Sequence, residues 1–139
     1  MDFTRRDALI LGAGAATAAL LPVGVFAAAG DEDIAAFTGG ADVSEGGVEL
    51  TAPEIAENGN TVPVAVSAPG ATAIMLLAMG NPSPRVATFT FGPLAGAQAA
   101  STRIRLAGTQ EVVAIAKLAD GSFARASSNV KVTIGGCGG

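Results

Sequence analysis

Short β-type segments alternate with turn clusters along the chain from Val48 onward, and this spacing constrains the fold more than any other feature of the sequence. The segments recur at roughly the 8–12-residue interval that is typical of all-β sandwiches. Within them, apolar residues such as Val62, Val64 and Val66 alternate with other residues, as in a strand with one buried face. The sequence therefore predicts an all-β protein, an immunoglobulin-like antiparallel β-sandwich of about seven strands, with a partly open barrel as the competing architecture. The strands are expected at residues 48–52, 62–68, 73–79, 85–91, 101–106, 110–118 and 123–134.

Two of these segments carry residues whose orientation follows from their chemistry. Pro63 has no backbone N–H to donate, so its strand is expected at a sheet edge or a bulge. In the segment 101–106, Ile104 and Leu106 should point into the core while Arg103 and Arg105 point outward.

The last strand should run directly into the C-terminal glycines and carry one apolar row, namely Val130, Val132 and Ile134.

The first 29 residues have the features of an export signal. Arg5-Arg6 precedes an uncharged stretch from 8 to 29, which ends in three alanines suited to cleavage after Ala29. The pair Arg5-Arg6 resembles the twin-arginine consensus, which predicts export to the periplasm. A retained transmembrane helix is the alternative, but Pro22 and the absence of a stop-transfer cluster count against it. We therefore expect no membrane attachment after the signal is removed.

The mature domain is expected to span residues 30–134, which is long enough to bury one core. It should open with a short amphipathic helix over 31–37, in which Ile34 and Phe37 lie on one face. Gly39-Gly40 should end this helix. Asn58-Gly59 and Asp120-Gly121 are interpreted as turns.

Composition excludes several classes of function. The chain carries 8 Lys and Arg against 12 Asp and Glu, so it offers no broad basic surface for nucleic acid. It contains no histidine, which removes the commonest general base and metal ligand. The acidic residues match no calcium-loop spacing, and the arginines are expected on a solvated face, although they could attract an anion. We therefore predict no metal, no cofactor and no catalytic activity of its own. The acidic residues considered for calcium are Glu45, Glu49, Glu54 and Glu57, and the arginines considered for an anion are Arg85, Arg103, Arg105 and Arg125.

The last five residues are the most unusual part of the sequence. Cys137 is the only cysteine and stands among four glycines, Gly135, Gly136, Gly138 and Gly139. Glycines add no packing and maximise chain freedom, so residues 135–139 are expected to form a flexible arm, which spans at most roughly 17 Å when extended. No basic residue lies near Cys137 in the sequence, and the terminal carboxylate disfavours its thiolate. We therefore expect activation to come from partner enzymes. A frayed tail with an incidental cysteine and an intermolecular disulfide remain alternatives.

Three segments together resemble one known family. The twin-arginine-like start, the stretch AENGNTVPV at 56–64 and above all VTIGGCGG at 132–139 are similar to SoxY, the sulfur-carrier subunit of the periplasmic thiosulfate-oxidising Sox system. The resemblance implies that Cys137 is the covalent attachment site and that Gly135, Gly136, Gly138 and Gly139 form the swinging arm. It also implies a heterodimer with a SoxZ-like subunit that is exported alongside. Phe89, Phe91 and the continuous apolar run 73–79 are candidates for the face that meets this subunit, although ordinary core is the simpler interpretation.

The resemblance further implies a reaction cycle carried out by other proteins. A c-type cytochrome complex would conjugate thiosulfate to Cys137, giving a cysteine S-thiosulfonate. A sulfate-releasing hydrolase would then leave a sulfane sulfur on the cysteine. A sulfane dehydrogenase would oxidise that sulfur further, or the sulfur would pass to storage.

Two rival functions stay open at this point. Ubiquitin-like sulfur carriers hold sulfur as a thiocarboxylate on a terminal glycine, but they are cytosolic, and the export signal counts against them. A periplasmic β-sandwich interaction module could instead dimerise through a disulfide at Cys137. Replacing Cys137 with Ser would separate these functions.

Overall fold

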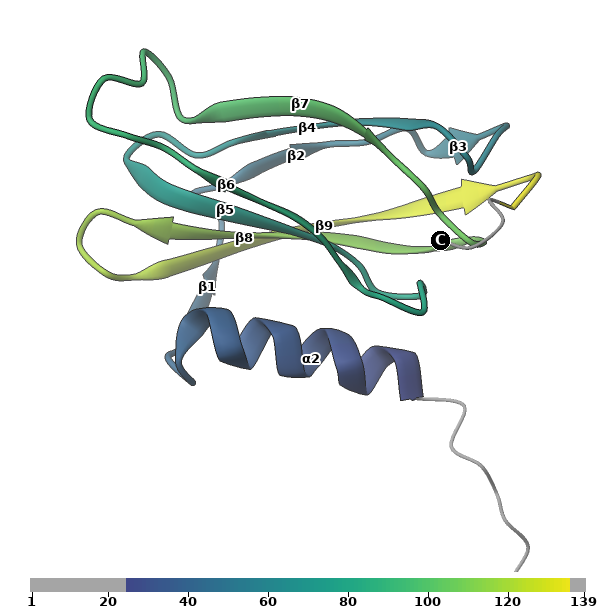
Figure 1. Cartoon of the computed structure of the whole chain (residues 1–139), viewed down its shortest axis with the longest axis horizontal. Helices are drawn as coiled ribbons and strands as arrows, with labels where there is room; N and C mark the ends of the chain where they lie inside the picture. Colours follow the sequence, from purple (N-terminus) through teal and green to yellow (C-terminus); the bar gives the residue numbers. More distant parts are fainter. Residues whose placement is uncertain (1–24, 136–139) are drawn as a thin grey trace, which may run out of the picture.

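Two β-sheets face each other, and one helix lies against the outer face of the larger sheet (Figure 1). The structure, a computed structural model, describes residues 25–135. The larger sheet has six strands in the order β1-β9-β8-β5-β6, with β3 also paired to β9, and the smaller has the order β2-β4-β7. The elements are α2 (Val25–Thr38), β1 (Val43–Glu45), β2 (Glu49–Thr51), β3 (Ile55–Ala56), β4 (Val62–Ser67), β5 (Ala71–Ala78), β6 (Arg85–Thr90), β7 (Ala99–Ile104), β8 (Gln110–Leu118) and β9 (Phe123–Val132). The immunoglobulin-like sandwich is confirmed.

All seven expected strands are present, and two short ones were not expected. Strands β1 and β3 pair with β9 in parallel, through Val43–Phe123 and Ile55–Lys131 respectively. Between them the chain crosses to the other sheet, where β2 pairs antiparallel with β4. The expectation of a purely antiparallel sandwich is therefore corrected by these two parallel pairings. They were missed because two- and three-residue strands carry no alternation that a sequence pattern can show.

The core lies in two layers, one on each face of the larger sheet. Between the sheets, side chains such as Ile74, Leu76 and Val112 are fully buried. On the outer face, Met75 and Leu77 are buried beneath α2. The continuous apolar run in β5 is thus explained, because its side chains are covered on both faces of the sheet. Phe89 and Phe91 are partly buried and pack against the core between the sheets, as the core interpretation expects.

Helix α2 contacts the sheet through the residues expected of it. Ile34 and Phe37 pack on the outer cluster, and the Phe37 ring lies edge-to-face with Phe123 at a centroid distance of 5.9 Å. The helix begins at Val25 rather than near residue 31. The alanines before Gly30 are good helix formers, and they had been assigned to the export signal. The expected boundary between residues 29 and 30 therefore falls within α2.

Pro63 does not lie in an edge strand, because β4 is the central strand of the smaller sheet. That expectation is wrong for the strand as a whole. The pairing of β2 with β4 ends at Thr51–Ala65, however, so Pro63 pairs only with Arg103 of β7. On the β2 side of Pro63 there is thus no paired strand to which an N–H would have to donate.

The orientation of 101–106 is as expected, with Ile104 and Leu106 buried and Arg103 and Arg105 exposed. The last strand is shorter than expected, because β9 ends at Val132. Of its expected apolar row, Val130 is buried and Val132 half-buried, whereas Ile134 is 66% exposed. Within residues 25–135, no helix is both long and apolar enough to cross a bilayer.

Candidate functional site

The segment that follows β9 leads to the C-terminal cysteine, and the structure describes it as far as Gly135. Cys137, Gly136, Gly138 and Gly139 lie outside the described residues, as do Arg5 and Arg6. Of the predicted arm, the structure therefore describes only Gly135, and of the predicted export signal only residues 25–29. We call residues 133–135 the arm root.

The arm root is tied to the turn that precedes β4. Thr133 donates two hydrogen bonds to this turn, from its N–H to Ala56 O (3.1 Å) and from its hydroxyl to Glu57 O (3.0 Å). Gly59 N–H donates to Ile134 O at 2.7 Å. These bonds continue the pairing of β3 with β9 beyond the last strand residue. The side chain of Ile134 remains mostly exposed. Backbone hydrogen bonds rather than burial thus hold the chain here.

Gly135 lies directly against the loop that follows β7. A Cβ added to Gly135 would stand 2.5 Å from Ala107 O, a distance that real Cβ atoms do not adopt. The same loop is bonded to the turn on the other side, because Leu106 N–H donates to Gly59 O at 2.8 Å. Gly59 therefore joins the loop to Ile134. The glycine at 135 is required by this close approach, in addition to any freedom it gives the arm.

Two buried amides stand behind this loop. Asn81 is 3% exposed and Gln110 is 9% exposed, and Gln110 Nε2 donates to Asn81 Oδ1 at 2.8 Å. Asn81 also bonds the loop directly, through Arg105 O (2.8 Å) and Ala107 N–H (2.9 Å). Neither Asn81 nor Gln110 was singled out from the sequence. Nothing local marks the pair, because the two residues meet only in the folded sheet.

The charged residues do not converge on one point. Within residues 25–135, the one ion pair joins Arg125 to Glu111 at 3.3 Å, and both side chains are about a third exposed. Such a pair contributes roughly 0–1 kcal/mol. Arg103 and Arg105 are exposed on β7 and the loop beyond it, on the side of the molecule where the arm root lies. Across the same described range, no three potential ligand side chains gather closely enough to hold a metal ion.

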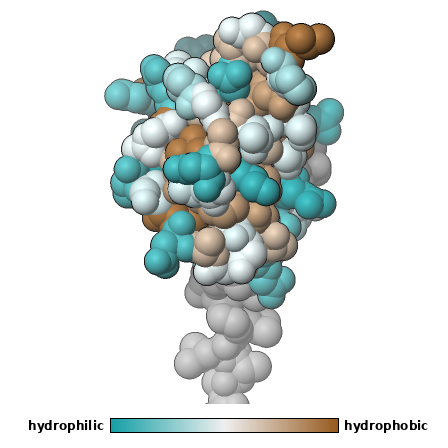
Figure 2. Space-filling model, turned by 90° about the vertical axis from the view of Figure 1, so that its left-hand side faces the viewer, coloured by the Kyte–Doolittle hydropathy of each residue, from teal (hydrophilic) through white to brown (hydrophobic). Residues whose placement is uncertain are grey.

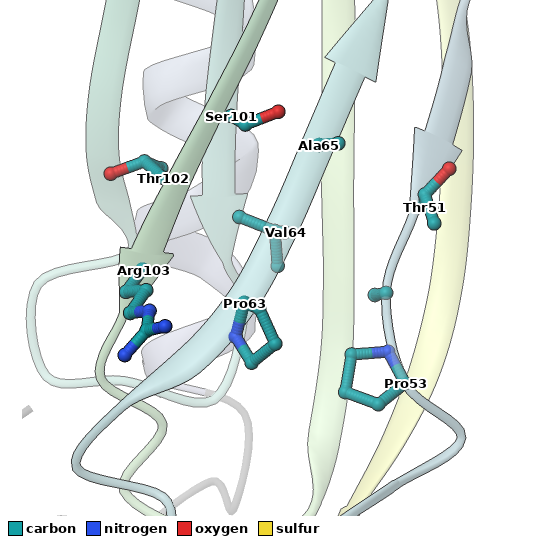
Figure 3. A pocket seen from close by; sticks show the side chains of 9 residues that line it. Thr51, Pro53, Pro63, Val64, Ala65, Ser101, Thr102 and Arg103 are labelled. Atoms are coloured by element: carbon teal, nitrogen blue, oxygen red, sulfur yellow. The ribbon is translucent and has the colours of Figure 1, made fainter.

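A shallow groove of about 550 Å³ crosses the outer face of the smaller sheet (Figure 3). It opens where the chain after β2 leaves β4, and small side chains form its floor. Arg103 lies at one end of the groove, beside Pro63 (Figure 3). The groove contains hydroxyls and one cation but no thiol or general base, so it is suited to binding rather than to bond breaking. The lining residues include Thr51, Pro53, Pro63, Ala65, Ser101 and Arg103.

Comparisons with known proteins identify the family. A family described as "Sulfur oxidation protein SoxY" matches residues 34–137. The chain is also similar to the solved structure of the sulfur carrier protein SoxY from Chlorobium limicola f thiosulfatophilum, with 40% identity and a TM-score of 0.68. That match covers 78% of this chain and 99% of the other. No curated protein sequence matches.

More distant structures share the fold alone. The superoxide reductase (neelaredoxin) from Ignicoccus hospitalis is 19% identical with a TM-score of 0.55, covering 63% of this chain and 80% of that one. A hypothetical protein from Pyrococcus horikoshii is 14% identical with a TM-score of 0.52, covering 64% and 96% respectively. These identities of 19% and 14% are well below the 40% identity to the Chlorobium protein, and the family match also covers residues 34–137. The chain belongs to the SoxY family.

Proposed function

We propose that this protein is a covalent carrier of sulfur intermediates in periplasmic thiosulfate oxidation, with Cys137 as the attachment site. The observation that carries the proposal is the family match, which extends from residue 34 to the single cysteine of the chain. The similar Chlorobium protein is named as a sulfur carrier, and nearly its whole length is covered. Gly136, Gly138 and Gly139 complete the proposed arm with Gly135.

The arrangement of the domain supports a carrier rather than an enzyme. The arm root leaves one end of the sandwich, and the four residues beyond it, 136–139, reach at most roughly 14 Å from it. The chain has no histidine to act as a general base beside the thiol. We therefore assign the chemistry to partner enzymes that receive the arm, and to this protein the task of holding the cargo.

In the proposed cycle, partner enzymes carry out each reaction on the cysteine. Thiolate and thiosulfate join as Cys-S-S-SO3⁻, and the two electrons released pass to a c-type cytochrome complex. A hydrolase then adds water to the terminal sulfonate, releasing hydrogen sulfate and leaving Cys-S-SH. The sulfane sulfur is oxidised by a sulfane dehydrogenase or passed to storage.

We further propose that the carrier works in the periplasm as a heterodimer with a SoxZ-like subunit. Arg5 and Arg6 would direct the folded pair to the twin-arginine route, since the partner subunit needs no signal when it is exported alongside.

The test is the intact mass of the protein purified from thiosulfate-grown cells, before and after reduction, with the C-terminal peptide sequenced. We expect reducible adducts built from sulfur, with or without a sulfonate group, on Cys137. Cys137→Ser should abolish loading. A protein that is always unmodified, or modified only as a Cys137-linked homodimer, would contradict the carrier function and favour a plain interaction module. A thiocarboxylate on Gly139 that survives Cys137→Ser would favour ubiquitin-like chemistry instead.

A further inference from the structure

We propose that Asn81 is a positioning residue for the carrier arm. Together with Gln110, it fixes the loop at residues 105–107, and through that loop it sets the point and direction from which the chain leaves the domain at Gly135. The role of this arrangement in presenting a cargo rests on the proposed carrier function, whereas the contacts themselves do not.

The amide of Asn81 holds the loop at two points. Its Nδ2 donates to Arg105 O and its Oδ1 accepts from Ala107 N–H, so the two bonds span Leu106. A loop held on both sides of one residue cannot rotate about that residue without breaking one of these two part-buried hydrogen bonds. Leu106 is fully buried, which anchors the same segment in the core. The loop is thus held by polar bonds and by packing together.

Gln110 holds Asn81 in place. Its Nε2 donates both to Asn81 Oδ1 (2.8 Å) and to Gly108 O (3.1 Å), while its Oε1 accepts from Gly80 N–H (2.9 Å). The pair therefore uses both of its carbonyl oxygens and both of its amide nitrogens. Buried polar groups whose nitrogens and oxygens all have partners favour one geometry over others. This network specifies the loop conformation more narrowly than apolar side chains of the same size would.

The loop transmits this geometry to the arm root by two contacts. Ala107 O stands where any side chain at Gly135 would have to lie, so the arm root follows the position of that carbonyl. Gly59 forms the second contact, accepting from Leu106 N–H and donating to Ile134 O. Asn81, the loop, Gly59 and the arm root are therefore connected without a break.

Spin labels test the inference on the full chain. Cys137 is the only cysteine, so one label attaches there and a second attaches at Thr88→Cys, an exposed position on β6. Double electron–electron resonance then gives the distribution of distances between the two labels. We expect Asn81→Ala to broaden this distribution on the order of twofold, because the loop gains local freedom. Gly135→Ala should shift its mean, because the added Cβ must move away from Ala107 O.

Two matched variants serve as controls. Thr38→Ala removes a buried hydroxyl that bonds Ile34 O at the opposite end of the sandwich. Gly96→Ala adds a methyl group where nothing lies within 4 Å. Both should leave the distance distribution unchanged. The inference is overturned if the distribution of Asn81→Ala coincides with that of the unsubstituted protein. An unchanged mean in Gly135→Ala would overturn it as well, because the arm root would then not follow Ala107 O.

The outcome is independent of the carrier assignment. If Asn81→Ala does not fold, Gln110→Ala still decides, because it removes the bond that fixes the Asn81 amide while the two bonds of Asn81 to the loop can still form. Unloaded Cys137 in thiosulfate-grown cells would refute the proposed function without changing the distance result. Unchanged distances with normal loading would refute the positioning role alone. The rate at which a small thiol reagent alkylates Cys137 should stay the same in Asn81→Ala, whereas loading by the partner enzymes should slow.

Discussion

The two ends of the sandwich are built differently. At the end with the arm root, two buried amides and a series of backbone hydrogen bonds join three loops to one another. At the opposite end, α2 is fixed by apolar contacts such as Phe37–Phe123, and the turns are exposed. Figure 2 views that second end and shows mostly hydrophilic and neutral residues with small hydrophobic areas. At the arm-root end the bonds between loops pass through two buried side chains, whereas at the opposite end the loops are joined by backbone bonds and one exposed side-chain bond, from Gly70 N–H to Gln98 Oε1.

The loops make the same contrast. The connection between β6 and β7 carries Leu94, which is 99% exposed. The loop after β7 carries Leu106, which is fully buried between two residues bonded by Asn81. Two leucines in two loops thus have opposite environments.

Exchanging each leucine for alanine should give the largest difference between the two ends. Leu106→Ala removes a fully buried side chain and should lower the free energy of unfolding by about 2–5 kcal/mol. Leu94→Ala removes an exposed one and should change it by less than about 0.5 kcal/mol. Urea denaturation measures both. Equal losses in the free energy of unfolding would show that the two leucines do not differ in burial.

A smaller effect is expected from the buried amide. Asn81→Ala leaves Ala107 N–H and Arg105 O without their partner and should cost about 1–3 kcal/mol in the free energy of unfolding. Asn58→Ala is a suitable control, since the Asn58 side chain accepts one exposed bond, from Asn60 N–H. Denaturation midpoints of the two variants give the comparison, and a loss in Asn81→Ala no greater than that of the control would contradict the importance of the amide pair.

The aromatic contact at the opposite end should contribute less again. A double-mutant cycle with Phe37→Leu and Phe123→Leu should yield a coupling energy of about 0.5–1.5 kcal/mol, as for other edge-to-face pairs. Because the contact is apolar, this coupling should not change with salt concentration. A coupling of zero would mean that α2 is held by the remaining contacts alone.

The smallest effect concerns the exposed turn between β8 and β9. The Ser122 hydroxyl, and then the Ser122 N–H, donate to the carboxylate of Asp120 and lower its pKa below 3.8. A lowered pKa in the folded state means that the turn gains stability above the unfolded pKa and loses it as the pH falls through the folded value.

Asp120→Asn should therefore be slightly less stable than the unsubstituted protein at neutral pH, and equal to it in strong acid. Denaturation midpoints measured across the acid range test this. A difference that grows toward low pH would contradict the sign.

The sequence predicted the parts of the fold that depend on local pattern. The alternation in β4 and the arginines of β7 gave correct strands and correct faces, because a period of two records burial directly. Strands β1 and β3 escaped prediction because their pairing with β9 is decided by residues some 80 positions away. The start of α2 was missed because alanines suit both a helix and an export signal.

The candidate site divides in the same way. Cys137 could be singled out because a lone thiol among glycines is visible in composition alone. Asn81 and Gln110 could not, since they lie 29 residues apart and each looks like an ordinary polar residue near a turn. Gly135 was recognised for its freedom, whereas the structure also requires it for its close approach to Ala107 O.

Helix α2 crosses the expected cleavage boundary, and this has an electrostatic consequence. In the whole chain its first turn carries no acidic residue. Cleavage after Ala29 would make Asp31, Glu32 and Asp33 the new first turn, where their carboxylates would face the positive end of the helix dipole. Ile34 and Phe37, which hold the helix on the sheet, would remain. Removing the leader would thus exchange an apolar helix start for an acidic one and strengthen the part of the helix that stays.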